Sequence, residues 1–190
     1  HTSDAGDLLL VNSAFSASAT GLKIFLKSGY KMKDPSIENL HPPLTEEQVI
    51  ANLRQTEDLS DQYYAAWWVG RMRSRHPETL PLLLAALDPL HENPIPSERR
   101  AVALNAIRAL GILQATNAEE NLRSLLKNND YSIREESARS LGMIQAQSAV
   151  LDLCELLSGG PDETEQIQPG SAKLKEPYES VLEALGAIGV

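Results

Sequence analysis

The chain has 190 residues and is 42% hydrophobic but only 5% aromatic, which is enough apolar material for one sizeable core. Its 26 acidic and 17 basic residues give a formal net charge of −9, which argues against nucleic acid as the main partner because phosphate contact needs a basic face. The single cysteine, Cys154, excludes an internal disulfide and favours a reducing compartment. The apolar run 8–11 is too short to span a membrane, so we expect no membrane insertion.

Residues 1–43 fit no repeat, and we expect them to form a separate N-terminal segment. The chain does not begin with Met, so we expect some of these residues to be foreign to the native protein or left by processing. Pro42 and Pro43 end this segment, and the run 45–48 is a capping box that predicts the start of a helix. We therefore expect a repeat domain over residues 44–190.

Within the repeat domain the pattern predicts short helices in pairs, with no strand pattern between them. We expect about four such helical hairpins. Ser60 and Ser97 are predicted to cap the second helices of the first two hairpins, and Asp130 begins the second helix of the third. The segment 159–175 is predicted to leave the repeat as a long loop, and the last helix is expected at 178–188.

An apolar residue followed by glycine recurs near the end of each second helix, at intervals of roughly 30 to 45 residues. The pairs are Val69-Gly70, Leu110-Gly111, Leu141-Gly142 and Leu185-Gly186. The helix start at 130–134 reads Asp-Tyr-Ser-Ile-Arg, and an Asp-x-x-Ile-Arg start is typical of a HEAT repeat. The sequence therefore predicts an all-α fold, an α-α superhelical solenoid of HEAT-like repeats.

Alignment on these glycines separates core positions from exposed ones. Two columns are apolar throughout and are predicted to form the core: Ala66, Ile107, Ala138 and Leu182, and Val69, Leu110, Leu141 and Leu185. The columns of Tyr63, Tyr64 and Trp67 also contain Arg or Glu, so we expect them to face water. The column of Trp68 is otherwise small, which predicts packing between neighbouring helices.

The aromatic residues of the helix at 62–73 are the main functional signal. This stretch holds both tryptophans of the chain, and Tyr63, Tyr64 and Trp67 are predicted to form an exposed binding surface. Second helices line the concave side of HEAT arrays, so we expect these rings to open onto a groove. The alternative is that residues 1–44 cover them.

Charged residues share the same expected groove. Arg108 and Arg139 stand in the column of Trp67, and guanidinium groups beside aromatic rings would suit a flat ligand that carries carboxylates. For either arginine the alternative is ordinary surface charge. Three carboxylates are also predicted to face the groove and to accept hydrogen bonds from such a ligand: Glu135, Glu136 and Glu179.

The last predicted helix and the cysteine carry further expectations. The apolar stripe of Leu182, Leu185 and Ile188 has no following repeat in the chain, so we expect a partner or a further C-terminal part to cover it. Cys154 lies among leucines and is expected to be a buried structural thiol, with a transient acceptor of a ligand as the alternative. The histidines and Cys154 lack ligand spacing, so no metal site is expected.

A longer set of motifs resembles the E subunit of the E/F-type phycobilin lyases, over about residues 44–190. The motifs are Tyr63-Tyr64-Ala65-Ala66-Trp67-Trp68-Val69-Gly70-Arg71, the preceding Leu44 to Leu53, and the later Pro177-Tyr178-Glu179 and Glu183-Ala184-Leu185-Gly186. The tyrosine-tryptophan motif is specific, whereas many HEAT proteins share the leucine-glycine repeat.

The resemblance implies a subunit of a heterodimeric lyase that pairs with a related F subunit. Such a lyase attaches phycocyanobilin, through a thioether bond, to a cysteine of the phycocyanin α subunit, and the subunit is expected to be active only with its partner. The implied setting is the cytoplasm of a cyanobacterium, where phycobilisomes are assembled for photosynthesis. Phycocyanobilin is then the substrate, and no tightly bound cofactor is expected.

Two alternatives remain open beside this interpretation. The chain could be the E-type subunit of an isomerising lyase for the phycoerythrocyanin α subunit, or a non-catalytic HEAT-repeat adaptor that binds phycobiliproteins. For a lyase, the predicted bilin-binding residues are Tyr63, Tyr64, Trp67, Arg108 and Arg139. No residue is singled out as the catalytic acid or base, and Tyr64 and Glu136 are the candidates.

Overall fold

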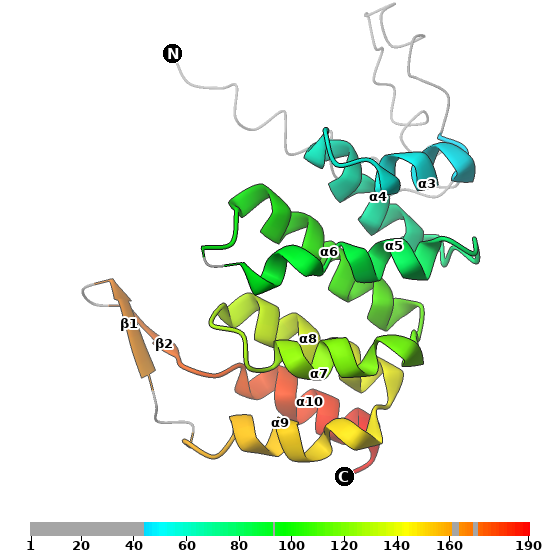
Figure 1. The fold of residues 1–190 in the computed structure, drawn as a ribbon. Helices are drawn as coiled ribbons and strands as arrows, with labels where there is room; N and C mark the ends of the chain where they lie inside the picture. The colour runs from blue at the N-terminus through cyan, green and yellow to red at the C-terminus, as the bar shows by residue number, and fades with distance from the viewer. Residues whose placement is uncertain (1–43, 93, 161–163, 169–170) are drawn as a thin grey trace, which may run out of the picture. The chain divides into compact units, whose positions relative to one another are not determined.

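The computed structural model describes residues 44–92, 94–160, 164–168 and 171–190 (Figure 1). The predicted N-terminal segment, residues 1–43, lies outside these ranges. The elements in chain order are α3 (Glu46–Arg54), α4 (Leu59–Arg71), α5 (Thr79–Ala85), the 3-10 turn η2 (Asp88–His91), α6 (Ser97–Ile112), η3 (Thr116–Ala118), α7 (Glu119–Leu125), α8 (Tyr131–Ile144), η4 (Gln147–Ala149), α9 (Val150–Leu156), β1 (Thr164–Gln168), β2 (Ser171–Leu174) and α10 (Tyr178–Ile188).

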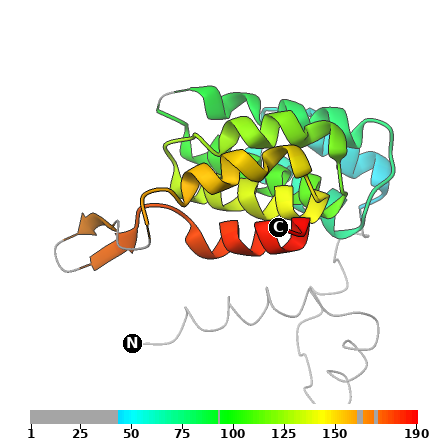
Figure 2. The ribbon, with the colours of Figure 1, turned by 90° about the horizontal axis from the view of Figure 1, so that it is seen from below.

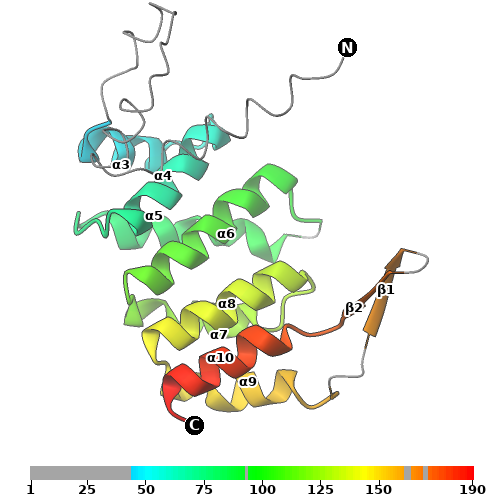
Figure 3. The ribbon, with the colours of Figure 1, turned by 180° about the vertical axis from the view of Figure 1, so that it is seen from behind.

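The helices pair along the chain into hairpins, α3 with α4, α5 with α6, α7 with α8 and α9 with α10, as predicted. The second helices α4, α6, α8 and α10 pack one against the next in a single layer, which faces the viewer in Figure 3. The first helices form the other layer, and Figure 2 shows α9 and α10 as the nearest members of the two layers. The predicted fold class, a HEAT-like α-α solenoid, is confirmed.

Side-chain caps explain where α3, α4 and α8 begin. The predicted capping box of α3 is present, with the Thr45 hydroxyl accepting from the Gln48 backbone N–H. Asp58 caps α4 just as Asp130 caps α8, because each carboxylate accepts from backbone N–H groups two and three residues further on. The repeated aspartate therefore fixes the start of two second helices.

Two predicted caps are wrong. Ser60 lies inside α4, and its backbone N–H donates to the carboxylate of Asp58 at 2.9 Å, so the aspartate two residues earlier is the cap. Ser97 is the first residue of α6, which has Pro96 as its N-cap and no side-chain cap. The fixed φ of Pro96 suits the extended backbone at the N-cap, so the backbone of the proline sets where α6 begins.

The predicted core columns are buried in α4, α6 and α8. Ala66, Ile107, Ala138, Val69, Leu110 and Leu141 have no exposed surface. In α10, Leu185 and Ile188 are only 8% and 6% exposed, so the prediction that they are uncovered is wrong, whereas Leu182 is 57% exposed. The buried stripe of α10 is centred on Val181, Ala184, Leu185 and Ile188, and Leu182 lies at its edge, so the prediction that Leu182 belongs to the core is wrong.

The column of Trp68 is a contact between second helices, as predicted. Its other members, Ala109, Ser140 and Ala184, are at most 2% exposed. Each lies against a glycine of the preceding helix, where an added β-carbon would come within 2.7 to 2.9 Å of it. The small residues therefore allow α4, α6, α8 and α10 to approach closely. Trp68 is partly buried and packs against the core.

The segment between α9 and α10 differs from the prediction. The sequence showed no strand pattern there, but β1 and β2 form a two-stranded antiparallel sheet with Thr164 opposite Leu174. Figures 1 and 3 show this hairpin extending away from the stacked helices. The two short strands pair their backbone groups with each other, so they need no long apolar alternation to form.

Ion pairs connect each repeat to the next on the side where the second helices begin. Arg100 of α6 pairs with Asp130, and Arg123 of α7 pairs with Asp152 of α9. Arg134 is buried and donates to the carbonyl oxygens of residues 128, 129 and 175 as well as to Glu176. The arginine of the HEAT motif thus holds the chain that enters α10 against the start of α8.

The structure also bears on the expectations for Cys154 and for membrane insertion. Cys154 is exposed, so the expectation of a buried structural thiol is wrong; its side of α9 faces away from the core that Leu153 enters. Within the described ranges, every helix is too short or too polar to serve as a membrane span.

Candidate functional site

The predicted aromatic surface lies on α4, and its exposure is confirmed. Tyr63, Tyr64 and Trp67 are 38%, 61% and 49% exposed. They alternate with Ala65, Ala66 and Val69, which the helical period directs into the core. The rings of Tyr63 and Tyr64 meet edge to face with their centroids 5.6 Å apart. The three rings therefore lie on the exposed side of α4.

The column of Tyr64 does not face water in the later helices, and this part of the prediction is wrong. Asn105, Glu136 and Ser180 are 3%, 7% and 1% exposed. Each of them contacts the preceding second helix, and Asn105 Nδ2, for example, donates to the backbone oxygen of Tyr63 at 3.2 Å. Tyr64 is exposed because, among the described residues, α4 has no second helix before it.

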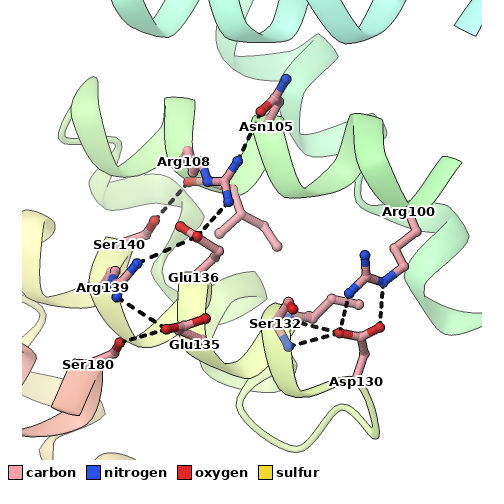
Figure 4. A network of polar contacts seen from close by, with 12 residues as sticks. Arg100, Asn105, Arg108, Asp130, Ser132, Glu135, Glu136, Arg139, Ser140 and Ser180 are labelled. Atoms are coloured by element: carbon pink, nitrogen blue, oxygen red, sulfur yellow. Dashed lines mark hydrogen bonds and ion pairs between the residues drawn. The ribbon is translucent and has the colours of Figure 1, made fainter. Parts of the chain in front are cut away.

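The predicted arginines lie side by side on neighbouring second helices, Arg108 on α6 and Arg139 on α8 (Figure 4). Their side chains are 48% and 39% exposed, so both present polar surface to solvent. We call the surface that they are predicted to share with Tyr63 and Trp67 the second-helix face. Tyr63 contributes, after Glu136, to the raised pKa of Arg108, and the place of Trp67 beside the arginines stays a prediction of the column alignment.

The arginines are not free, which the sequence did not predict. Arg108 Nη2 lies 2.7 Å from Glu136 Oε1, and Arg139 Nη1 lies 3.8 Å from the same oxygen. Arg139 Nη2 also donates to Glu135 Oε1 at 3.2 Å. The Glu135–Arg139 spacing of one helical turn was readable in the sequence, but the pair between α6 and α8 depends on tertiary packing.

The network includes a further residue of α6 and reaches α10 (Figure 4). Arg108 Nη1 donates to Asn105 Oδ1 at 3.4 Å, and Ser180 Oγ on α10 donates to Glu135 Oε1 at 3.4 Å. The Glu136 carboxylate raises the pKa of Arg108 through their hydrogen bond. Arg108 is therefore a permanent cation whose orientation is fixed by Glu136 and Asn105.

These contacts change the interpretation of the predicted carboxylates. Glu136 is buried and its Oε1 is shared by two guanidinium groups, so its carboxylate is committed to the arginines rather than open to a ligand. Glu135 is half-buried. Glu179 is exposed on α10 and, within the described residues, pairs with neither Arg108 nor Arg139, so we do not count it among the ligand-binding residues. Tyr64, the other candidate for a catalytic role, keeps its side chain open to solvent.

The cavities found in the structure lie elsewhere. One of about 710 Å³ is lined by Lys127, Arg134, Glu155 and Lys175 and lies near the start of α8 and α10. A second of about 490 Å³ is lined by residues including Leu90, Arg100 and Asp130. Neither includes a residue of the second-helix face, so this face is an exposed surface rather than part of either cavity. Among the described residues, no group of three or more His, Cys, Asp or Glu could hold a metal ion.

Two family models of helical repeats match the chain. Residues 90–168 match the family model of HEAT repeats, and residues 61–89 match that of the PBS lyase HEAT-like repeat. The second match covers α4 from residue 61 onward and includes Tyr63, Tyr64 and Trp67.

Several curated relatives share most of the chain. It is 84% identical over 159 residues to the bilin biosynthesis protein RpcE of Synechococcus sp. (strain WH8020), covering 84% of this chain and 60% of that protein. It is 46% identical over 139 residues to the phycocyanobilin lyase subunit alpha of Synechococcus elongatus, covering 73% of this chain and 50% of the relative.

A solved structure matches as well. The complex of CpcE and CpcF of phycocyanin lyase from Nostoc sp. PCC7120 contains a chain that aligns with a TM-score of 0.66 at 39% identity, over 83% of this chain and 57% of that one. The present chain thus spans between 50% and 60% of the length of these relatives.

Stacked helical hairpins of this kind define a HEAT-repeat solenoid protein. Within that class, the chain is a homologue of E-type phycobilin lyase subunits, and its curated relatives include alpha subunits of phycocyanobilin lyase.

Proposed function

We propose that the chain is part of the E-type subunit of a heterodimeric lyase that attaches phycocyanobilin, by a thioether bond, to a cysteine of the phycocyanin α subunit. The observation that carries the proposal is that two exposed rings and two half-exposed arginines lie on the second helices of a homologue of such subunits. The proposed partner is an F-type subunit, as in the complex of the Nostoc relative. The proposed setting is the cyanobacterial cytoplasm.

The second-helix face suits the chemistry of an open-chain tetrapyrrole. The pigment is flat and carries two propionates, so Tyr63 and Trp67 would stack on its rings while Arg108 and Arg139 bind its carboxylates. A ring contact contributes about 0.5–1.5 kcal/mol, and a hydrogen bond to a charged group about 1.5–3 kcal/mol. The arginines would therefore set the orientation of the pigment. Tyr64 lies at the edge of this face and would extend the stacking surface.

Thioether formation explains what the subunit contributes. The thiolate of the substrate cysteine adds to an activated double bond of the pigment, and the proton that the thiol gives up ends on the pigment. A protein promotes this addition by holding the two reactants in a productive geometry and by assisting the proton transfer. Phycocyanobilin is the substrate in this scheme, and no resident cofactor is involved. We propose Tyr64 as the residue whose hydroxyl is placed to assist a proton transfer.

Pigment binding tests the proposal, because a lyase has to hold the pigment and an adaptor does not. The pigment would be titrated into the chain, with binding followed by its absorbance and by quenching of tryptophan fluorescence. We expect saturable binding that weakens about tenfold or more in Trp67→Ala combined with Arg108→Gln. Saturable binding to apo-phycocyanin without pigment binding would instead support the non-catalytic adaptor.

The choice of protein substrate needs a separate comparison. Apo α subunits of phycocyanin and of phycoerythrocyanin would be offered in parallel to the chain with its F-type partner. Faster attachment to the phycocyanin α subunit, with an unchanged chromophore spectrum, is the expected result. A product with a shifted spectrum on the phycoerythrocyanin α subunit would favour the isomerising lyase.

A further inference from the structure

The two carboxylates next to Arg139 differ in burial and in attachment. Glu136 is 7% exposed and its Oε1 contacts both Arg108 and Arg139. The Glu135 side chain is 27% exposed, and its contact with Arg139 is a pair within one helix at 3.2 Å. Arg139 is thus held by one buried carboxylate and one accessible carboxylate.

These two pairs also differ in how easily they exchange. A partly exposed pair one helical turn apart, such as Glu135 with Arg139, changes an equilibrium constant by only about twofold. A buried carboxylate such as that of Glu136 cannot lose its cationic partners without being left desolvated and unpaired. A carboxylate arriving from solvent can therefore replace Glu135 on Arg139, but it cannot replace Glu136.

We propose that Glu135 occupies, in the free protein, the place that a ligand carboxylate takes on Arg139. Glu136 stays in position and holds the guanidinium groups of Arg108 and Arg139 next to one another, because both approach its Oε1. Glu135 keeps a partner after it is displaced, since its Oε1 also accepts from Ser180 Oγ on α10. This inference rests on the proposed function and makes Glu135 a specificity-determining residue of the same face.

The exchange has a consequence for ligand choice. A ligand carboxylate replaces the charge and the hydrogen bond that Glu135 gives up, so a planar ligand with free carboxylates gains the contact with Arg139. A ligand whose carboxylates are esterified cannot displace Glu135, and it would bind through the rings of Tyr63 and Trp67 alone. The site therefore selects the free acid of a pigment over its neutral ester.

The test compares these two forms of one pigment on three proteins. Phycocyanobilin and its dimethyl ester would be titrated into the wild-type chain, into Glu135→Gln and into Glu179→Gln. Glu179 is the matched control because it stands in the same column on α10 and carries the same charge. We expect Glu135→Gln to bind the free acid about two- to fivefold more tightly than the wild type. The ester should bind all three proteins alike, and Glu179→Gln should stay within about twofold of the wild type for both ligands.

Several outcomes would overturn the inference. Unchanged or weaker binding of the free acid to Glu135→Gln would mean that Glu135 does not compete for Arg139. An equal gain for the ester, or an equal gain in Glu179→Gln, would mean that general charge rather than exchange is responsible. A wild-type chain that binds neither form would overturn the proposed function itself, and the inference with it. Equal urea midpoints for the three proteins exclude unfolding as the cause.

Discussion

Gly142 of α8 lies so close to Ala184 of α10 that a β-carbon at position 142 would come within 2.7 Å of the Ala184 Cα. This is backbone against backbone, so no side-chain rotation relieves it. Gly186 occupies the same column one helix further on, and an added β-carbon there meets nothing within 4 Å. The same residue type at equivalent positions is thus required in one helix and dispensable in the other.

Substitution of these two glycines should therefore have opposite effects on stability. We expect Gly142→Ala to lower the free energy of unfolding by about 1–3 kcal/mol, because α8 and α10 have to move apart. Gly186→Ala should leave it unchanged or raise it by up to about 1 kcal/mol, since alanine favours a helix. Urea unfolding followed by circular dichroism measures both. Equal effects of the two substitutions would show that the close approach is not what α8 requires.

The Asp130 carboxylate predicts a pH dependence. Its hydrogen bond with Arg100 lowers the pKa of Asp130 below the ordinary value of 3.8. A lowered pKa means that the pair stabilises the fold fully above about pH 4 and loses this contribution as the pH falls through the folded-state pKa. Asp130→Asn keeps a capping side chain but removes the charge, so it should cost about 0.5–1 kcal/mol at neutral pH.

The check is urea unfolding of the wild type and Asp130→Asn from neutral pH downward. The difference between the two proteins should shrink as the wild-type carboxylate becomes protonated. Asp130→Ala, which loses the cap as well, should cost about 1–2 kcal/mol more than Asp130→Asn at neutral pH. A gap between wild type and Asp130→Asn that is constant with pH would show that Arg100 does not stabilise the ionised form.

The adjacent tryptophans should separate stability from binding. Trp67 is 49% exposed, so Trp67→Ala should cost less than about 1 kcal/mol of stability while weakening pigment binding. Trp68 packs against the core, so Trp68→Ala should cost about 2–4 kcal/mol. Thermal unfolding of the two variants checks the contrast. A larger loss of stability in Trp67→Ala than in Trp68→Ala would contradict the assignment of the two rings.

Arg134 should stabilise the repeat domain more than the other arginines that connect repeats. Its side chain is 10% exposed and its removal leaves Glu176 without a partner, so Arg134→Gln should cost about 3–5 kcal/mol. Arg123, 38% exposed in its pair with Asp152, is the control, and Arg123→Gln should cost less than about 1 kcal/mol. Amide exchange at residues 174–176 should also become faster in Arg134→Gln but not in Arg123→Gln. Similar losses in the two variants would contradict this role for Arg134.

The repeat architecture was predictable because each copy carries its own local signals. The capping box at 45–48, the aspartate that begins α8 and the apolar three-residue spacing of the second helices act within one or two turns of helix. The exposure of Trp67 and the partial burial of Trp68 were also predictable. The aligned copies have charged residues in the column of Trp67 and small residues in the column of Trp68.

The errors arose where packing between copies decides the outcome. Glu136 looked like a surface residue because a column with Glu, Asn and Ser is polar, yet the preceding helix covers it and Arg108 neutralises it. A polar column can therefore be an internal hydrogen-bonded layer, which only the stacking of the helices reveals. The strands at 164–168 and 171–174 were missed because two short strands satisfy their backbone groups by pairing with each other and need no apolar alternation.

Covalent pigment transfer tests the central claim most directly. The chain, and a longer form of the length of its relatives, would be incubated with an F-type partner, phycocyanobilin and the apo α subunit of phycocyanin. The product would be detected by zinc-enhanced fluorescence on a denaturing gel. We predict fluorescence on the α subunit that depends on the E-type chain and falls about tenfold or more with Trp67→Ala combined with Arg108→Gln. Attachment that is as fast in a reaction without any E-type chain as in reactions with the short or the long form would contradict the account.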